Sequence, residues 1–238
     1  MSQQVVRLVD VRSALTASAC ALALLAAALL GSGLAAGPAS SGSSAQPAPD
    51  YGDLPLSFQP AAGRYEGIDY LSSGAAGSIA VGPDGIRFEQ SYGTKRNPKA
   101  AAIALRLPGA TLENPTAHQR QPGVVNDLRG DDPAKHVTEI PTFASLSYAE
   151  AWPGIDLVLR GSGANPEYDF ELAPGADPSR ISMRIAGADS ARIAPSGDLL
   201  IRSAGAVFRQ KAPVSYQPSP DGRVPVESSF RLAGRTVA

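Results

Sequence analysis

The sequence predicts an all-β fold, an antiparallel β-sandwich-like domain, for residues 50–238. After residue 50 helical periodicity is nearly absent, and short runs of alternating apolar and polar residues recur between Gly, Pro, Asp and Asn. One kind of turn joins such runs at residues 82–85, 194–197 and 219–222, with Pro second and Gly last in each. Because proline fixes φ and glycine relaxes the last position, each turn predicts a hairpin. A strand about every 8 to 14 residues is typical of a sandwich.

Strand candidates follow one another along the whole domain. The three hairpins pair residues 78–81 with 86–90, 191–193 with 199–202, and 214–216 with 224–232. The other candidates are residues 68–72, 102–107, 142–148, 155–160, 167–172 and 181–186. Residues 100–107 are alanine-rich and compatible with a helix, but their alternation and the following Pro108 predict a strand.

Residues 1–36 have the pattern of a secretory signal peptide. Arg7 and Arg12 precede an apolar run of small residues at 14–30, and small residues then allow a cut after Ala35. The alternative is an uncleaved membrane anchor, because residues 14–36 exceed the roughly 20 that span a bilayer. Cys20 does not predict a lipoprotein, since most of the apolar run follows it and Ala17 stands where a lipobox has leucine.

Residues 37–49 predict a flexible linker of Pro, Ser, Gly and Ala between the export segment and the domain. They carry no charge and no side chain larger than that of Gln46, so they cannot bury enough surface to offset the entropy of ordering. Residues 50–238 then form a single β-rich domain, a length that is sufficient for one hydrophobic core.

The composition excludes several functional classes. The chain has 21 basic and 22 acidic residues and a net charge of −1, which provides no field for nucleic acid. Two His and one Cys cannot form the usual zinc cage of Cys and His ligands. The motifs of serine hydrolases, nucleotide-binding loops and zinc proteases are absent. We therefore expect no catalytic, cofactor-binding or metal-binding residues, no cofactor, and no enzymatic activity.

Three isolated residues have a chemical and a structural interpretation. His118 and His136 lie in polar, loop-like sequence without a nearby nucleophile and acid, which indicates ordinary surface histidines. Trp152, before Pro153 and Gly154, could stack on a sugar if it were exposed. An aromatic side chain at the end of the sandwich core is the stronger interpretation.

The acidic residues Glu167, Asp169 and Glu171 alternate with Tyr168, Phe170 and Leu172 and therefore share one strand face. Paired carboxylates could serve a glycoside hydrolase or bind calcium. A solvated face opposite a buried one is the interpretation that we favour.

The same strand predicts a hairpin register with residues 155–160. Across a six-residue loop at 161–166, Arg160 lies opposite Glu167, Val158 opposite Asp169, and Asp156 opposite Glu171. The other face then forms core from Ile155, Leu157, Leu159, Tyr168, Phe170 and Leu172. Asp156 and Glu171 repel each other, and we expect Arg184 to neutralise them, since two carboxylates supply too few of the about six to eight oxygens that calcium takes.

Several segments resemble a known family. They are residues 56–60, 70–74, 140–143, 152–157, 167–170, 173–178 and 209–217. Together they resemble a β-rich domain of unknown function that precedes arrays of SBBP-type β-propeller repeats in bacterial secreted and surface proteins. The resemblance covers residues 54–232 and implies an extracellular, non-catalytic module. It departs from the family at residues 61–63, which replace an expected Asn-containing turn, and at Ala238, where the expected closing strand and propeller repeats do not follow.

The resulting functional hypothesis is a non-catalytic module at the cell surface or outside the cell, with the periplasm as another destination. It would be a structural or interaction domain of a propeller-repeat surface protein that lacks its repeats. The alternatives are a carbohydrate-binding module and a glycan-active hydrolase. The expected partner is an extracellular protein or glycan of unknown identity, and membrane contact is expected only through an uncleaved N-terminal segment.

The C-terminal region also predicts self-association. Residues 226–232 are expected to pair with 213–217 across the turn at 219–223. With the closing strand missing, one sheet edge stays open, and open edges template association.

Overall fold

A computed structural model describes residues 4–8, 11–13, 56–74, 77–94, 96–162 and 165–238. These residues form three antiparallel sheets, and their only helical turns are two short 3-10 segments, Pro133–Lys135 and Pro178–Arg180. The predicted all-β, sandwich-like fold is confirmed. The apolar run at 14–30, Cys20 and the linker at 37–49 lie outside the described residues.

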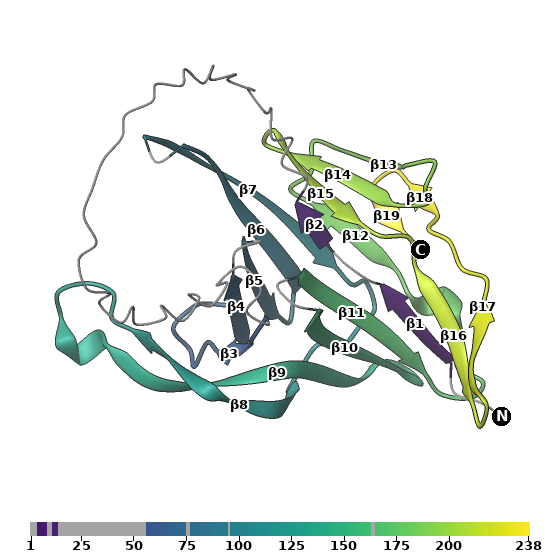
Figure 1. Cartoon of the computed structure of the whole chain (residues 1–238), viewed down its shortest axis with the longest axis horizontal. Coiled ribbons are helices and arrows are strands. Elements are labelled where there is room, and N and C mark those ends of the chain that lie inside the picture. Colours follow the sequence, from purple (N-terminus) through teal and green to yellow (C-terminus); the bar gives the residue numbers. More distant parts are fainter. Residues whose placement is uncertain (1–3, 9–10, 14–55, 75–76, 95, 163–164) are drawn as a thin grey trace, which may run out of the picture.

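Two large sheets and a smaller one contain the strands of the described residues (Figure 1). From one edge to the other, the seven-stranded sheet consists of β17 (Gly222–Val226), β16 (Val214–Ser219), β1 (Gln4–Leu8), β11 (Asn165–Leu172), β10 (Ile155–Ser162), β9 (Val137–Trp152) and β8 (Thr116–Asp127). The eight-stranded sheet consists of β18 (Leu232–Ala233), β19 (Thr236–Val237), β12 (Met183–Ala186), β7 (Asn97–Arg106), β6 (Gly85–Thr94), β5 (Gly77–Gly82), β4 (Tyr70–Gly74) and β3 (Gln59–Pro60). The four-stranded sheet consists of β13 (Ser190–Ile193), β14 (Leu199–Ser203), β15 (Ala206–Gln210) and β2 (Val11–Ser13).

The three predicted turns close hairpins. Gly82 pairs with Gly85 around Pro83 and Asp84, and Ser219 pairs with Gly222 in the same way. Gly85 has a φ of 120°, and a Cβ there would lie 2.2 Å from the carbonyl oxygen of Leu105. Glycine is therefore required at this turn both for its backbone conformation and for the approach of β7.

The third hairpin differs from the prediction in its second strand. Because Ser219 already pairs with Gly222, the ladder runs from residues 222–226 and ends with Val226 opposite Ser215. Residues 227–231 are not in a strand, and the next strand, β18, pairs with β19 in the eight-stranded sheet. The predicted pairing of 226–232 with 213–217 is therefore wrong apart from Val226.

Strand β8 was not predicted, because most of its side chains are exposed and its sequence lacks an alternating apolar pattern. It lies at the end of the seven-stranded sheet, where one neighbour, β9, supplies its pairing. His118 therefore lies in a strand, and the prediction that it lies in a loop is wrong.

The N-terminal segments β1 and β2 are paired within the sheets. β1 lies between β11 and β16, and β2 pairs with β15 (Figure 1). The sequence predicted that residues 1–36 form a signal peptide or anchor outside the domain. Cleavage after Ala35 stays a prediction, and it would remove both strands.

The core lies between the sheets and is rich in large aliphatic and aromatic side chains. The largest fully buried ones are Tyr148, Tyr168, Phe58, Phe170, Ile86, Leu105, Leu146, Ile155, Leu157, Leu172, Ile185 and Leu199. Core residues come from both large sheets and from the four-stranded sheet. This shared core ties the three sheets together by hydrophobic burial.

Candidate functional site

The β10–β11 hairpin has the predicted register. Arg160 pairs with Glu167, Val158 with Asp169, and Asp156 with Glu171. The ladder continues through Gly161 with Pro166 to Ser162 with Asn165, so the connection is shorter than the predicted six-residue loop. The six predicted core residues of the hairpin are all buried, as the alternation requires.

The acidic face of β11 is buried, so the prediction of a solvated face is wrong for two of its three residues. Glu167 is 7 % exposed and Asp169 is 0 % exposed, whereas Glu171 is half-buried. Val5 of β1, opposite Glu171 in the register, is also 7 % exposed. The face is covered at this point of the sheet, which a strand with water on one side would not be.

Arg160 is the counterion of the two buried acids. Its Nε lies 3.6 Å from Oε2 of Glu167, and its Nη2 donates a hydrogen bond to Oδ2 of Asp169. Both carboxylates belong to one strand and contact one guanidinium. Glycoside hydrolysis needs two carboxyl groups on opposite sides of a sugar, and this cluster does not provide that arrangement.

The like-charge pair is relieved in a different way from the one predicted. Oδ1 of Asp156 accepts a hydrogen bond of 2.7 Å from the backbone N–H of Glu150, whose φ of 50° accompanies the bulge between β9 and β10. Arg184 lies on β12 of the eight-stranded sheet, opposite Arg106 and Thr236. The prediction that Arg184 neutralises Asp156 and Glu171 is therefore wrong.

No group of three or more metal-ligating side chains occurs in the part of the chain that the structure describes.

Trp152 lies in the core, as predicted. It is 3 % exposed, its indole Nε1 donates to the Pro108 carbonyl at 3.1 Å, and its ring meets that of Phe170 edge-on at 5.6 Å. A buried indole cannot stack on a sugar. Trp152 therefore gives no support to the alternative of a carbohydrate-binding module. Two half-buried tyrosines are covered by guanidinium groups, Tyr216 by Arg223 and Tyr65 by Arg129.

The two histidines make simple surface contacts. His118 Nε2 lies 2.7 Å from the Ser147 hydroxyl, and His136 Nε2 lies 3.0 Å from the Gly130 carbonyl oxygen. Neither contact joins a histidine to a carboxylate and a nucleophile, which a catalytic triad requires.

Sequence reasoning missed a polar contact at the centre of the fold. The Tyr168 hydroxyl of β11 donates to Met183 Sδ of β12 at 3.2 Å and accepts a hydrogen bond from Gln210 Nε2 of β15. Burial raises the pKa of Tyr168, and the hydrogen bond from Gln210 opposes this rise to a lesser degree. One residue from each sheet takes part, and no local sequence signal could have brought the three together.

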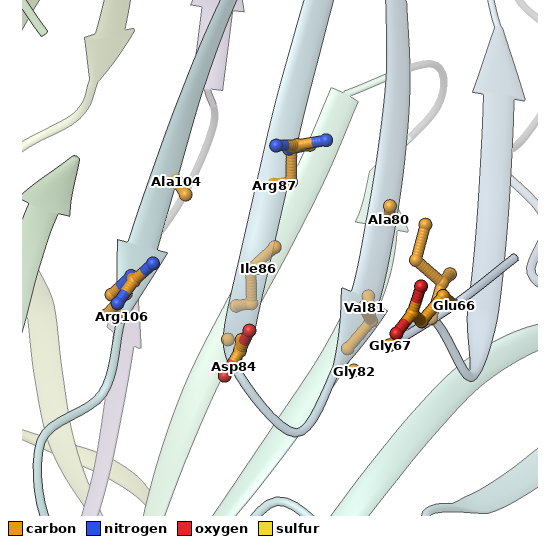
Figure 2. Close-up of a pocket in the computed structure, with 12 residues that line it drawn as sticks. Glu66, Gly67, Ala80, Val81, Gly82, Asp84, Ile86, Arg87, Ala104 and Arg106 are labelled. Atoms are coloured by element: carbon orange, nitrogen blue, oxygen red, sulfur yellow. The ribbon is translucent and has the colours of Figure 1, made fainter. Parts of the chain in front are cut away.

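A small pocket of about 190 Å³ lies beside the β5–β6 turn (Figure 2). Its charged side chains are Glu66, Asp84, Arg87 and Arg106. Figure 2 shows Arg87 on β6, Arg106 on β7, Asp84 at the β5–β6 turn, and Glu66 on the segment beside β5. Arg87 is exposed and lies 3.7 Å from Glu89. Exposed charges of both signs around a small pocket do not define a ligand.

A larger pocket of about 690 Å³ lies among β11, β12, β16, β17 and the C-terminal residues. Its lining combines apolar residues, such as Phe170 and Met183, with serines. The Ser215 hydroxyl is buried there, and it has no hydrogen-bond partner within the described residues. The buried hydroxyls of Ser72 and Tyr148, which do not line this pocket, also have no partner within the described residues, so the Ser215 hydroxyl does not by itself mark a ligand site.

A family model described as a domain of unknown function, DUF7948, matches residues 58–238. The chain belongs to the DUF7948 family. No curated protein and no solved structure matches the chain. The match agrees with the resemblance to a β-rich domain of unknown function, and it begins after β1 and β2. The propeller repeats and the bacterial surface proteins remain an expectation.

Within the described residues, no helix is both long and apolar enough to cross a membrane, and the apolar run at 14–30 is not among them.

Proposed function

We propose that this DUF7948 protein is a non-catalytic β-module that acts at the cell surface or outside the cell as a structural or interaction domain. The observation that carries the proposal is how the buried charges are used. Arg160, Glu167 and Asp169 contact one another across the β10–β11 ladder and line neither the small nor the larger pocket. Charged groups that pair with one another inside a sheet help to hold its strands in register. In a catalytic site, by contrast, such groups would have to face a substrate.

Export is supported by the N-terminal sequence. Two arginines, an apolar run and a small-residue cleavage site follow one another in the order of a signal peptide. The resemblance to domains that precede propeller repeats favours a place in a larger surface protein. The exposed edge at β17 suits pairing with a strand of another protein.

The test is the location and the N-terminus of the native protein. Cells are fractionated, and the protein is detected in each fraction with an antibody against the domain. The N-terminus of the protein is then determined by mass spectrometry. We expect it outside the cytoplasm, with a new N-terminus between Ala36 and Ala39. Cytoplasmic protein that begins at Met1 would contradict the proposal, and intact Met1 on membrane-bound protein would replace cleavage by anchoring.

Self-association through an open edge remains part of the proposal. β17 ends the described part of the seven-stranded sheet, and Val224 on it is 52 % exposed. Such an edge can pair with a second copy. Light scattering at high concentration should show particles larger than a monomer, and a strictly monomeric profile would count against this part.

A further inference from the structure

β1 is the strand that connects two parts of the seven-stranded sheet. It pairs with β11 from Gln4 opposite Leu172 to Leu8 opposite Tyr168, and with β16 from Val5 opposite Tyr216 to Arg7 opposite Val214. In the described sheet β11 and β16 do not pair with each other. Without β1, two strand edges would face each other across a gap one strand wide, and their inward N–H and C=O groups would lose their partners.

The strand that fills this gap lies outside the residues that the family model matches. The family match begins at residue 58, whereas β1 ends at Leu8. β1 also belongs to the segment that the proposed export would cut away. In this chain the strand position between β11 and β16 is therefore filled by a segment outside the matched residues 58–238.

The larger pocket adjoins the same position. Val6 lies opposite Phe170 on β11 and opposite Ser215 on β16 in the register, and both of these residues line the pocket of about 690 Å³. The unpartnered hydroxyl of Ser215 lies there as well. A bound strand would gain backbone hydrogen bonds along both edges, and a pocket at one of its positions would select a side chain. This is the way in which strand-adding domains bind peptides.

We propose that the gap between β11 and β16 is an acceptor site for an extended segment of a second exported polypeptide, a site that β1 fills in the uncut chain. The proposal rests on the proposed export and cleavage. The segment runs antiparallel to both neighbours, has no proline over about five residues, and places an apolar side chain at the position of Val6.

The experiment uses the full chain with a site-specific protease sequence inserted between Gly42 and Ser43, purified in mild detergent. The folded protein is cut, and a fluorescent peptide of residues 2–13 is added in excess to displace the N-terminal fragment. Binding is measured by fluorescence anisotropy on the cut and the uncut protein. The matched control is the same peptide with Val6→Pro, which cannot donate a hydrogen bond at that residue.

We expect saturable binding to the cut protein. The uncut protein should bind at least about tenfold more weakly, because its tethered β1 competes at high effective concentration. The Val6→Pro peptide should also bind at least about tenfold more weakly.

Several outcomes would overturn the site. They are equal binding of the original and the Val6→Pro peptide, equal binding to cut and uncut protein, and no binding to a cut protein that keeps its β-sheet circular dichroism. A cut protein that unfolds and does not refold with peptide would also contradict it. Dimers that form only after the cut, and that the peptide does not dissociate, would assign the gap to a second copy instead.

This result is independent of the location experiment. Peptide binding together with an intact Met1 on the native protein would retain the strand site and reject cleavage. A new N-terminus between Ala36 and Ala39 without peptide binding would retain export and reject the site.

Discussion

The hairpins β10–β11 and β16–β17 lie in one sheet and have similar antiparallel ladders, yet their polar faces differ. In β11 every residue from Pro166 to Phe170 is buried, including two acids. In β17 the first four residues are exposed. β11 has a partner on each side, whereas the described sheet ends at β17. The difference shows that an alternating sequence sets the register, while neighbours distant in sequence decide whether the polar face meets water.

The largest effect should come from the core of the first hairpin. Phe170→Ala removes a fully buried ring that contacts Trp152 and Tyr168, and we expect it to lower the free energy of unfolding by about 3–5 kcal/mol. Val224→Ala on β17 should change it by less than about 0.5 kcal/mol, because Val224 is largely exposed. Urea denaturation of both variants measures the two free energies of unfolding. Equal losses would contradict the difference between the two hairpins.

The next effect concerns the buried charges. Arg160→Ala leaves Glu167 and Asp169 without their guanidinium, and we expect a loss of about 3 kcal/mol, at the lower end for a broken buried pair because the Arg160 side chain is 29 % exposed. The control is Arg223→Ala, which removes a contact with the ring of Tyr216 and should cost less than about 1 kcal/mol. A smaller loss for Arg160→Ala than for Arg223→Ala would contradict the structural role of the cluster.

A smaller effect should appear in alkali. Burial raises the pKa of Tyr168 in the folded state, so the stability that its neutral hydroxyl contributes is complete below about pH 10 and falls as pH rises further. The free energy of unfolding should fall by about 1.4 kcal/mol per pH unit for each such tyrosine. Denaturant titrations between about pH 9 and 11 measure the slope. Tyr168→Phe should make it shallower, and an unchanged slope would show that Tyr168 does not contribute.

The smallest effect is expected from calcium. The two buried carboxylates of β11 are already paired with Arg160, so the thermal midpoint should be the same in millimolar calcium and in chelator. A rise of several degrees with calcium would show that the acidic face binds the metal and would overturn the metal-free assignment.

The sequence predicted those features that depend on neighbouring residues. The turns at 82–85 and 219–222 and the register from Ile155 opposite Leu172 follow from local spacing, and the structure confirms them. The burial of Asp169 could not be predicted, because it depends on the strands beside it and not on its own alternation. Strand β8 escaped prediction for the opposite reason, since an exposed edge strand needs no apolar pattern.

The candidate site was less predictable than the fold. Tyr168, Met183 and Gln210 meet only because three sheets converge, and the gap filled by β1 exists only in the assembled sheet. Trp152 was correctly assigned to the core, because the Pro-Gly turn after it ends a strand against an apolar face. The role expected for Arg184 was wrong. Its strand was predicted correctly, but that strand belongs to the eight-stranded sheet and not to the sheet of Asp156 and Glu171.

The position of β1 also affects the order in which the molecule can fold. Its two partner strands follow it by most of the length of the chain, so their ladders with β1 have very high contact order and close late. During synthesis the first residues to leave the ribosome are then among the last to find their place. If this segment is the export signal that we propose, it would therefore be unpaired while the rest of the chain is being made.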